Sequence, residues 1–151
     1  MYRFVIASIV VACFVTPAAG QSEEDAVMAT VMQLFDGMRA GDSSAVRAAF
    51  SEGAQLYRNQ QGRVTPGAID GFVRAVGAPK DSIWDERIWD ETIHIDDNIA
   101  SVWTQYAFFL GPRLSHCGID SFQLVKGPNG WKIFALVDTR RTEGCEVPSN
   151  R

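Results

Sequence analysis

Apolar residues near the start of the chain recur at the spacing of an α-helix. Acidic residues at positions 23–25 are followed by an apolar series at steps of three and four, and Gly41 comes after it. This spacing puts the apolar side chains on one face, and acidic residues favour a helix N-terminus. We therefore expect an amphipathic helix over residues 22–40, which buries Val27, Val31, Leu34, Phe35 and Met38.

Two shorter helices are expected before residue 80. Asp42 or Ser43 can cap a helix that runs to Phe50, because short polar side chains bind the free N–H groups of a first turn. Pro66 is favourable at the first position of a third helix, which Gly77 would end. A short strand is expected between these two helices, at residues 54–57.

The pattern changes from helical to alternating after Pro79. Four runs of alternating apolar and polar residues follow, at 83–95, 99–110, 115–126 and 131–140. The residues between the runs, such as Asp97-Asn98 and Gly127 to Gly130, are typical of tight turns. Helices followed by an antiparallel meander indicate an α+β fold in one domain.

The turns also predict which side chains share a face of the sheet, because a hairpin turn fixes the strand register. One inner face then divides into an apolar end and an end that mixes polar with aromatic side chains. Apolar walls with a few converging polar groups are typical of a small-molecule pocket. The predicted pocket residues are Arg87, Trp89, Thr104, Tyr106, Phe108, His116, Asp120 and Arg141.

A β-bulge would change this assignment, because it moves every later residue of a strand to the other face. In the last strand, a bulge would place Asp138 beside the pocket in place of Thr139. His116 and Asp120 depend less on such shifts, since both lie on one strand.

His116 and Asp120 are the candidate catalytic residues. Asp120 could act as a general base or acid, His116 as its partner, and Tyr106 or Arg141 could stabilise developing negative charge. In the alternative interpretation nothing reacts: His116 caps the sheet edge, and Asp120 forms an ion pair with Arg87 or Arg141.

The opposite face of the predicted sheet is too apolar to be left in water on a monomer. We therefore expect a homodimer that pairs through this outer face. The residues expected there are Trp103, Gln105, Ala107, Phe109, Ile119, Gln123, Val125, Phe134 and Leu136.

Residues 1–20 have the composition of a secretory signal peptide, with an apolar run and small residues before Gln21. Lipidation at Cys13 and an uncleaved anchor are the alternatives. Cleavage leaves Cys117 and Cys145, an even pair for which we expect a disulfide in an oxidising compartment. The mature protein, residues 21–151, would be periplasmic or secreted and would not remain in a membrane.

Charge and motif content argue against several other functions. The net charge of -4 does not favour a nucleic-acid surface, which needs clustered Lys and Arg. We expect no metal, because His and Cys residues lack zinc-site spacing. We expect no cofactor, because no glycine-rich phosphate loop opens a helix.

Four segments of the second half resemble proteins of the nuclear transport factor 2-like (NTF2-like) superfamily. The likeness is greatest to the SnoaL-like, exported bacterial branch that carries the "putative lumazine-binding" label. The segments are Asn98–Trp103, Ser115–Leu124, Gly130–Ile133 and Asp138–Arg141.

The resemblance implies a cone in which a strongly curved, mainly antiparallel sheet wraps around the N-terminal helices, over residues 21–151. It also implies pairing through the outer face of the sheet. It does not imply one activity, because relatives include isomerases, cyclases, dehydratases and non-enzymatic binding modules.

We therefore expect an exported protein that binds a small apolar or aromatic ligand in an apolar cone pocket. The first alternative is an acid–base enzyme of the isomerase, dehydratase or hydrolase type that uses the same pocket. The second is a non-catalytic interaction module.

Overall fold

Three helices form one layer of the protein, seen here in a computed structural model that describes residues 21–149. Helix α1 (Glu23–Ala40) begins at a capping box, in which the Ser22 side chain accepts from the Asp25 backbone and the Asp25 side chain accepts from Ser22. Asp42 caps helix α2 (Ser43–Ala49). Helix α3 (Ile69–Gly77) starts later than predicted, because Pro66 belongs to a strand. The predicted signal peptide and Cys13 lie outside the described residues.

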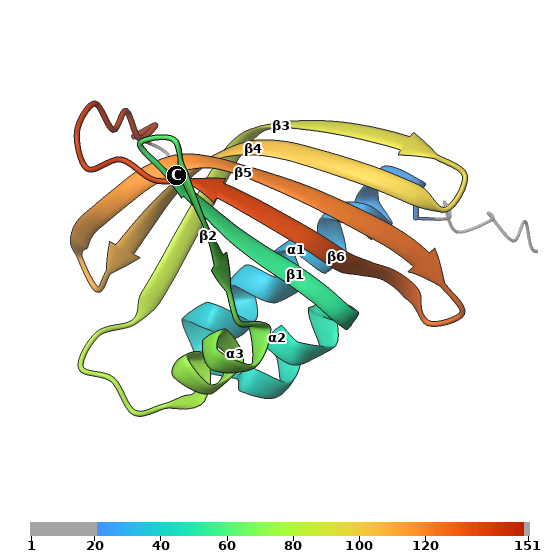
Figure 1. The fold of residues 1–151 in the computed structure, drawn as a ribbon, viewed down its shortest axis with the longest axis horizontal. Coiled ribbons are helices and arrows are strands. Elements are labelled where there is room, and N and C mark those ends of the chain that lie inside the picture. Colours follow the sequence, from blue (N-terminus) through green and yellow to red (C-terminus); the bar gives the residue numbers. More distant parts are fainter. Residues whose placement is uncertain (1–20, 150–151) are drawn as a thin grey trace, which may run out of the picture.

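A mixed sheet forms the second layer and bends around α1 (Figure 1). Its strands are β1 (Phe50–Gln60), β2 (Arg63–Gly67), β3 (Trp84–Asp96), β4 (Ile99–Leu110), β5 (Arg113–Gly127) and β6 (Gly130–Thr139). The spatial order is β2-β1-β6-β5-β4-β3, with β1 parallel to β6 and all other pairs antiparallel. The predicted α+β fold is confirmed, although the strand expected at 54–57 is much longer and β2 was not expected.

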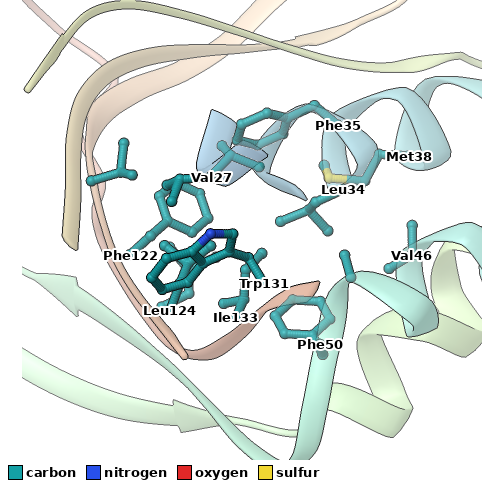
Figure 2. Close-up of a cluster of buried hydrophobic side chains, with 14 of the residues drawn as sticks. Val27, Leu34, Phe35, Met38, Val46, Phe50, Phe122, Leu124, Trp131 and Ile133 are labelled. Carbon is teal, nitrogen blue, oxygen red and sulfur yellow. The ribbon is translucent and has the colours of Figure 1, made fainter. Parts of the chain in front are cut away.

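The core lies between α1 and the inner face of the sheet (Figure 2). The apolar side of α1 meets β5 and β6, where Phe35 packs edge-on against Phe122 with ring centroids 6.0 Å apart. Burial of a large apolar side chain stabilises a fold by about 1.5–3 kcal/mol. The predicted apolar series of α1 is buried as expected.

A β-bulge in β3 overturns part of the predicted register. Ile93 and Ile95 oppose Val102 and Ala100 as predicted, but the register shifts between Trp89 and Thr92. The backbone of Asp90 takes a positive φ of 55° at this point. As a result, Trp89 opposes Gln105 instead of Tyr106.

Arg87 and Trp89 therefore do not face the inner side, and Glu86 and Ile88 replace them there. Two contacts stabilise the bulge. The Thr104 hydroxyl donates to the Trp89 carbonyl (2.9 Å), and the Gln105 amide donates to the Asp90 carboxylate (2.9 Å).

A second register shift makes the pairing of β5 with β6 differ from the predicted one. Leu124 opposes Ile133 as expected, but the shift next to it pairs Asp120 with Asp138. This is the arrangement that a bulge in the last strand was expected to produce. It also turns Leu136 to the inner side, where it is buried, so its placement on the outer face was wrong. Arg141 bridges to Cys117 and not to His116.

A disulfide joins Cys117 of β5 to Cys145 of the C-terminal segment, as predicted. The bond closes a loop with a sequence separation of 28 residues. Closing a loop of this length stabilises a fold by about 3.6 kcal/mol, because it restricts the unfolded chain. Val147 and Cys145 pack on the outer side of the sheet against Trp89, Ala107 and Phe109. The chain thus covers part of its own outer apolar face.

The rest of that face keeps large apolar side chains in contact with solvent. Trp103 is 55% exposed, Ile99 57% and Val137 38%. Within residues 21–149, no helix has both the length and the apolar character needed to cross a bilayer.

Candidate functional site

A cavity of about 360 Å³ lies between the helices and the inner face of the sheet. Its walls are mainly apolar and come from both layers, whereas its polar groups come from strands and from the segment just after β6. The apolar lining comprises Leu34, Phe35, Met38, Leu56, Phe72, Trp84, Phe108, Leu110 and Leu136. The polar lining comprises Arg58, Glu86, Tyr106, Ser115, His116, Asp120, Asp138 and Arg140.

Four of the predicted pocket residues meet in this cavity: Tyr106, Phe108, His116 and Asp120. They lie on β4 and β5, whose pairing of Phe108 with His116 and of Thr104 with Asp120 follows the predicted register. Thr104 is fully buried beside Asp120, but its hydroxyl is engaged by backbone carbonyls.

The other predicted residues lie elsewhere. Arg87 and Trp89 face away because of the β3 bulge, and Arg87 stacks on the Phe109 ring. Arg141 is exposed and lines separate shallow hollows near residues 59–62 and 142–143.

Two acidic side chains meet at the floor of the cavity. Asp120 is 1% exposed, and its carboxyl group lies within hydrogen-bonding reach of the Glu86 carboxyl. Burial, together with the charge of Glu86, raises the pKa of Asp120 well above its usual range. Burial also raises the pKa of Glu86, to about 7. The pair therefore holds at least one proton below neutral pH.

One oxygen of this pair has no hydrogen-bond partner. Asp120 Oδ2 is fully buried, and no donor of residues 21–149 is in contact with it. A buried polar atom without a partner costs about 1–3 kcal/mol. Either the shared proton or a bound molecule would remove that cost.

Asp138 and Arg58 form a second charged pair at the cavity. Arg58 Nε lies 3.6 Å from Asp138 Oδ2, and the Arg58 side chain is 51% exposed. Burial raises the pKa of Asp138, and the charge of Arg58 acts in the opposite direction. This pair is closer to solvent than Asp120.

His116 is uncharged in this environment. Burial, followed by the positive charges of Arg140 and Arg58, lowers the pKa of His116 to about 4. Its Nδ1 lies 3.1 Å from the Ser115 hydroxyl, and its ring centroid lies 5.0 Å from that of Phe108. His116 is not paired with Asp120, so the cooperation expected between them would need a molecule between the two.

Tyr106 has a structural contact that limits its predicted role. Its hydroxyl donates to the Thr139 carbonyl at 2.8 Å. Burial also raises the pKa of Tyr106, so the phenol keeps its proton. Because that proton is already donated to Thr139, it is not available to stabilise a negative charge. The role of Tyr106 seen here is to hold the end of β6 in position.

Sequence reasoning missed Glu86, Arg58 and Arg140, and it reached Asp138 only through the bulge alternative. For Glu86, the sequence contains a sign in the alternation of side chains along the segment that forms β3. Trp84, Glu86 and Ile88 alternate on even positions, whereas Ile93 and Ile95 occupy odd ones. Such a change of phase within one strand indicates a bulge.

A hollow of similar size, about 380 Å³, lies outside the core at the end of α1 and residues 76–84. It contains no buried ionisable side chain. Within residues 21–149, no group of three or more potential metal ligands was found in either place. We therefore take the interior cavity as the candidate site.

A family model described as "putative lumazine-binding" matches residues 22–137. The chain belongs to this putative lumazine-binding family. A search of curated proteins returned no match. The predicted membership of the NTF2-like superfamily is confirmed by the family match together with the solved structures that share the fold.

Three of those structures illustrate how widely the fold of this family member is shared. A protein of unknown function from Mycobacterium tuberculosis has a TM-score of 0.67 at 14% identity, with 81% of this chain and 73% of that chain covered. An NTF2-like protein of unknown function from Shewanella baltica has a TM-score of 0.62 at 18% identity, with 80% of this chain and 95% of that chain covered. A putative dehydratase of the NTF2-like family from Streptomyces avermitilis has a TM-score of 0.60 at 13% identity, with 79% of this chain and 96% of that chain covered. Identities this low show the fold alone.

Proposed function

We propose that this protein binds a small, mainly apolar or aromatic molecule in the interior cavity. The observation that carries the proposal is the buried Asp120 oxygen without a partner, at the floor of a cavity whose walls are mainly apolar. Apolar walls favour burial of the ligand, and a few polar groups fix its orientation. The family description, putative lumazine-binding, agrees with ligand binding.

The arrangement of charges argues against a purely structural role for the acidic pair. Buried carboxyl groups are costly unless they are hydrogen-bonded or paired with a cation. The alternative expectation was an ion pair of Asp120 with Arg87 or Arg141. Instead, Arg87 pairs with Asp85, and no ion pair among residues 21–149 includes Asp120.

Binding can be tested by filling the cavity from one strand. Ser115 lines the cavity, whereas Ser121 faces the outer side of the same strand. We expect aromatic fragments of about ten heavy atoms to bind wild type and Ser121→Trp in ligand-observed NMR, but not Ser115→Trp. Equal binding by both tryptophan variants would place the site elsewhere, and no binding by wild type would exclude the function.

A second candidate function, acid–base catalysis, is favoured by the protonation of the pair. A carboxyl group with a pKa near 7 can accept a proton and return it at neutral pH. In this proposal Glu86 is the base, Asp120 holds the shared proton and orients Glu86, and the uncharged His116 donates or accepts a hydrogen bond. The solved structure described as a putative dehydratase shares this fold, which supports the candidate by analogy only.

We also propose that the protein acts in the periplasm or outside the cell. The Cys117–Cys145 disulfide is compatible with an extracellular protein. A non-catalytic interaction module remains the alternative in which the cavity serves no ligand.

A further inference from the structure

Arg140 is a charged group of the cavity that forms no ion pair within residues 21–149, although its charge counteracts the rise in the pKa of Asp138. It directly follows β6, is half-buried and lines the cavity. Its backbone N–H donates to the Asn59 carbonyl at 3.2 Å, which fixes the start of the side chain. Across the described part of the chain, its guanidinium forms no ion pair and no hydrogen bond.

The neighbouring arginine at the cavity behaves differently. Arg58 pairs with Asp138, so these two charges cancel. The charge of Arg140 remains, and it helps to lower the pKa of His116 after the larger effect of burial. Its positive charge is therefore close to the interior of the cavity, where an arginine without a partner is a ready site for an anion.

The floor of the cavity offers a different kind of contact. The Asp120–Glu86 pair is deeply placed and carries a proton, so it can donate to and accept from an uncharged oxygen. A carboxylate at this depth would meet two acidic groups and would be repelled. The cavity thus has an anion-binding group at Arg140 and a neutral hydrogen-bonding group at its floor.

We propose that the ligand is a small apolar or aromatic carboxylic acid with an uncharged hydroxyl or carbonyl group at its far end. The carboxylate binds Arg140, the uncharged oxygen binds the Asp120–Glu86 pair, and the body packs against Phe72, Phe108 and Leu136. This inference rests on the proposed function and narrows its ligand class.

The charge balance gives the proposal a pH dependence. The charges of Arg58 and Asp138 cancel, and Asp120 keeps its proton. The net charge of the cavity is therefore that of Arg140 when Glu86 is protonated, and it is zero when Glu86 is ionised. The pKa of Glu86 is raised to about 7, so protonation grows as pH falls through neutrality. Carboxylate affinity should therefore increase from about pH 8 to about pH 6. The helices contribute apolar side chains to the cavity. The ionisable groups that face the Asp120–Glu86 pair come from the strands and the residue after β6: Arg58 on β1, Asp85 on β3, Tyr106 on β4, His116 on β5, and Asp138 and Arg140 at the end of β6.

The probes are matched acids and amides: 4-hydroxycinnamate with 4-hydroxycinnamamide, and 6-hydroxy-2-naphthoate with 6-hydroxy-2-naphthamide. The acid and the amide of each pair share the same aromatic part, and they differ in whether one end is a charged carboxylate or an uncharged amide. We expect each acid to bind wild type about tenfold more tightly than its amide in isothermal titration calorimetry, because charge-assisted hydrogen bonds to arginine are the stronger ones. Equal affinities for acid and amide would overturn the inference.

Arg140→Gln and Arg141→Gln are the matched variants. Both remove one positive charge from adjacent positions, but only Arg140 lines the cavity. Arg140→Gln should lose about tenfold in acid affinity and leave amide affinity unchanged, whereas Arg141→Gln should keep the preference of wild type. Glu86→Gln should abolish the change of acid affinity between about pH 6 and pH 8.

The outcomes separate this inference from the function on which it rests. If the amides bind in the cavity as tightly as the acids, ligand binding stands and the carboxylate assignment falls. If Arg141→Gln weakens acid binding as much as Arg140→Gln, the effect is one of net surface charge, and the inference is wrong. If no probe binds, both the ligand class and the proposed function are contradicted.

Discussion

At the scale of single residues, the site depends on two carboxyl groups that share a proton in an apolar cavity. Burial disfavours their charged forms, which raises the pKa of both Asp120 and Glu86. The same burial lowers the pKa of His116 to about 4, because there the charged form is the protonated one. In the candidate acid–base function, Glu86 and not His116 would therefore be the base near neutral pH.

The second candidate function predicts proton abstraction by Glu86. 5-Nitrobenzisoxazole is a suitable probe, because a carboxylate that removes its C3 proton breaks the N–O bond and releases a coloured cyanophenolate. The rate should rise as pH increases through about 7, since the basic form of Glu86 grows over that range.

Glu86→Gln should lower this rate by about a hundredfold at about pH 8, the usual range for loss of a general base. Glu91→Gln is the matched control, because Glu91 is exposed on the same strand. A rate that survives Glu86→Gln, or that has no pH dependence near 7, would exclude Glu86 as the base.

At the scale of secondary-structure elements, bulges determine which residues reach the cavity. The sequence was sufficient for the positions of the helices apart from the start of α3, for strands β3 to β6 and for the β4–β5 hairpin, so His116, Asp120, Tyr106 and Phe108 were found. Turn residues fix the register of a hairpin near its turn, but a bulge farther along shows only as a change in the phase of alternation, which a register counted from the turn does not take into account.

The bulge near Asp90 is the clearest example of that limit. It lies six or more residues from the Asp97-Asn98 turn, beyond the part of β3 whose register the turn sets. Contacts with Thr104 and Gln105, which belong to another strand, stabilise it. Such contacts exist only after β3 and β4 have paired, and for this reason Arg87 and Trp89 were assigned to the wrong face.

Gly118 is an element-scale test of how tightly β5 meets the end of β6. A Cβ atom at this position would lie 1.9 Å from the Thr139 carbonyl oxygen, the same atom that accepts from Tyr106. Gly118→Ala should therefore lower the free energy of unfolding by about 2–4 kcal/mol, as overpacking against backbone does.

Gly127→Ala is its control, because nothing lies within 4 Å of a Cβ atom built there. Urea unfolding followed by tryptophan fluorescence would compare the two variants. Equal stabilities would show that β5 and β6 are farther apart at Thr139 than described here.

At the scale of the whole molecule, pairing through the outer face stays a prediction. The C-terminal segment already covers Ala107 and Trp89, which reduces the apolar surface that suggested a dimer. Trp103, Ile99 and Val137 remain exposed on that face. We expect a dimer in sedimentation velocity at micromolar concentration.

Trp103→Glu should shift the protein toward a monomer, because a buried unpaired charge disfavours an interface. Val64→Glu is the control, since Val64 is 57% exposed, similar to Trp103 at 55%, but lies on the edge strand β2. A monomeric wild type, or equal effects of the two substitutions, would contradict pairing through this face.

The parallel pairing of β1 with β6 affects when the cavity can exist during synthesis. Arg58 lies opposite Asp138 across this pair, so a wall of the site joins early and late parts of the chain. On the ribosome, the first helices and the β1–β2 hairpin emerge long before their partner strand, and such distant contacts form slowly. Chains that are cut short before β6 would lack the cavity altogether, whatever helices they have formed.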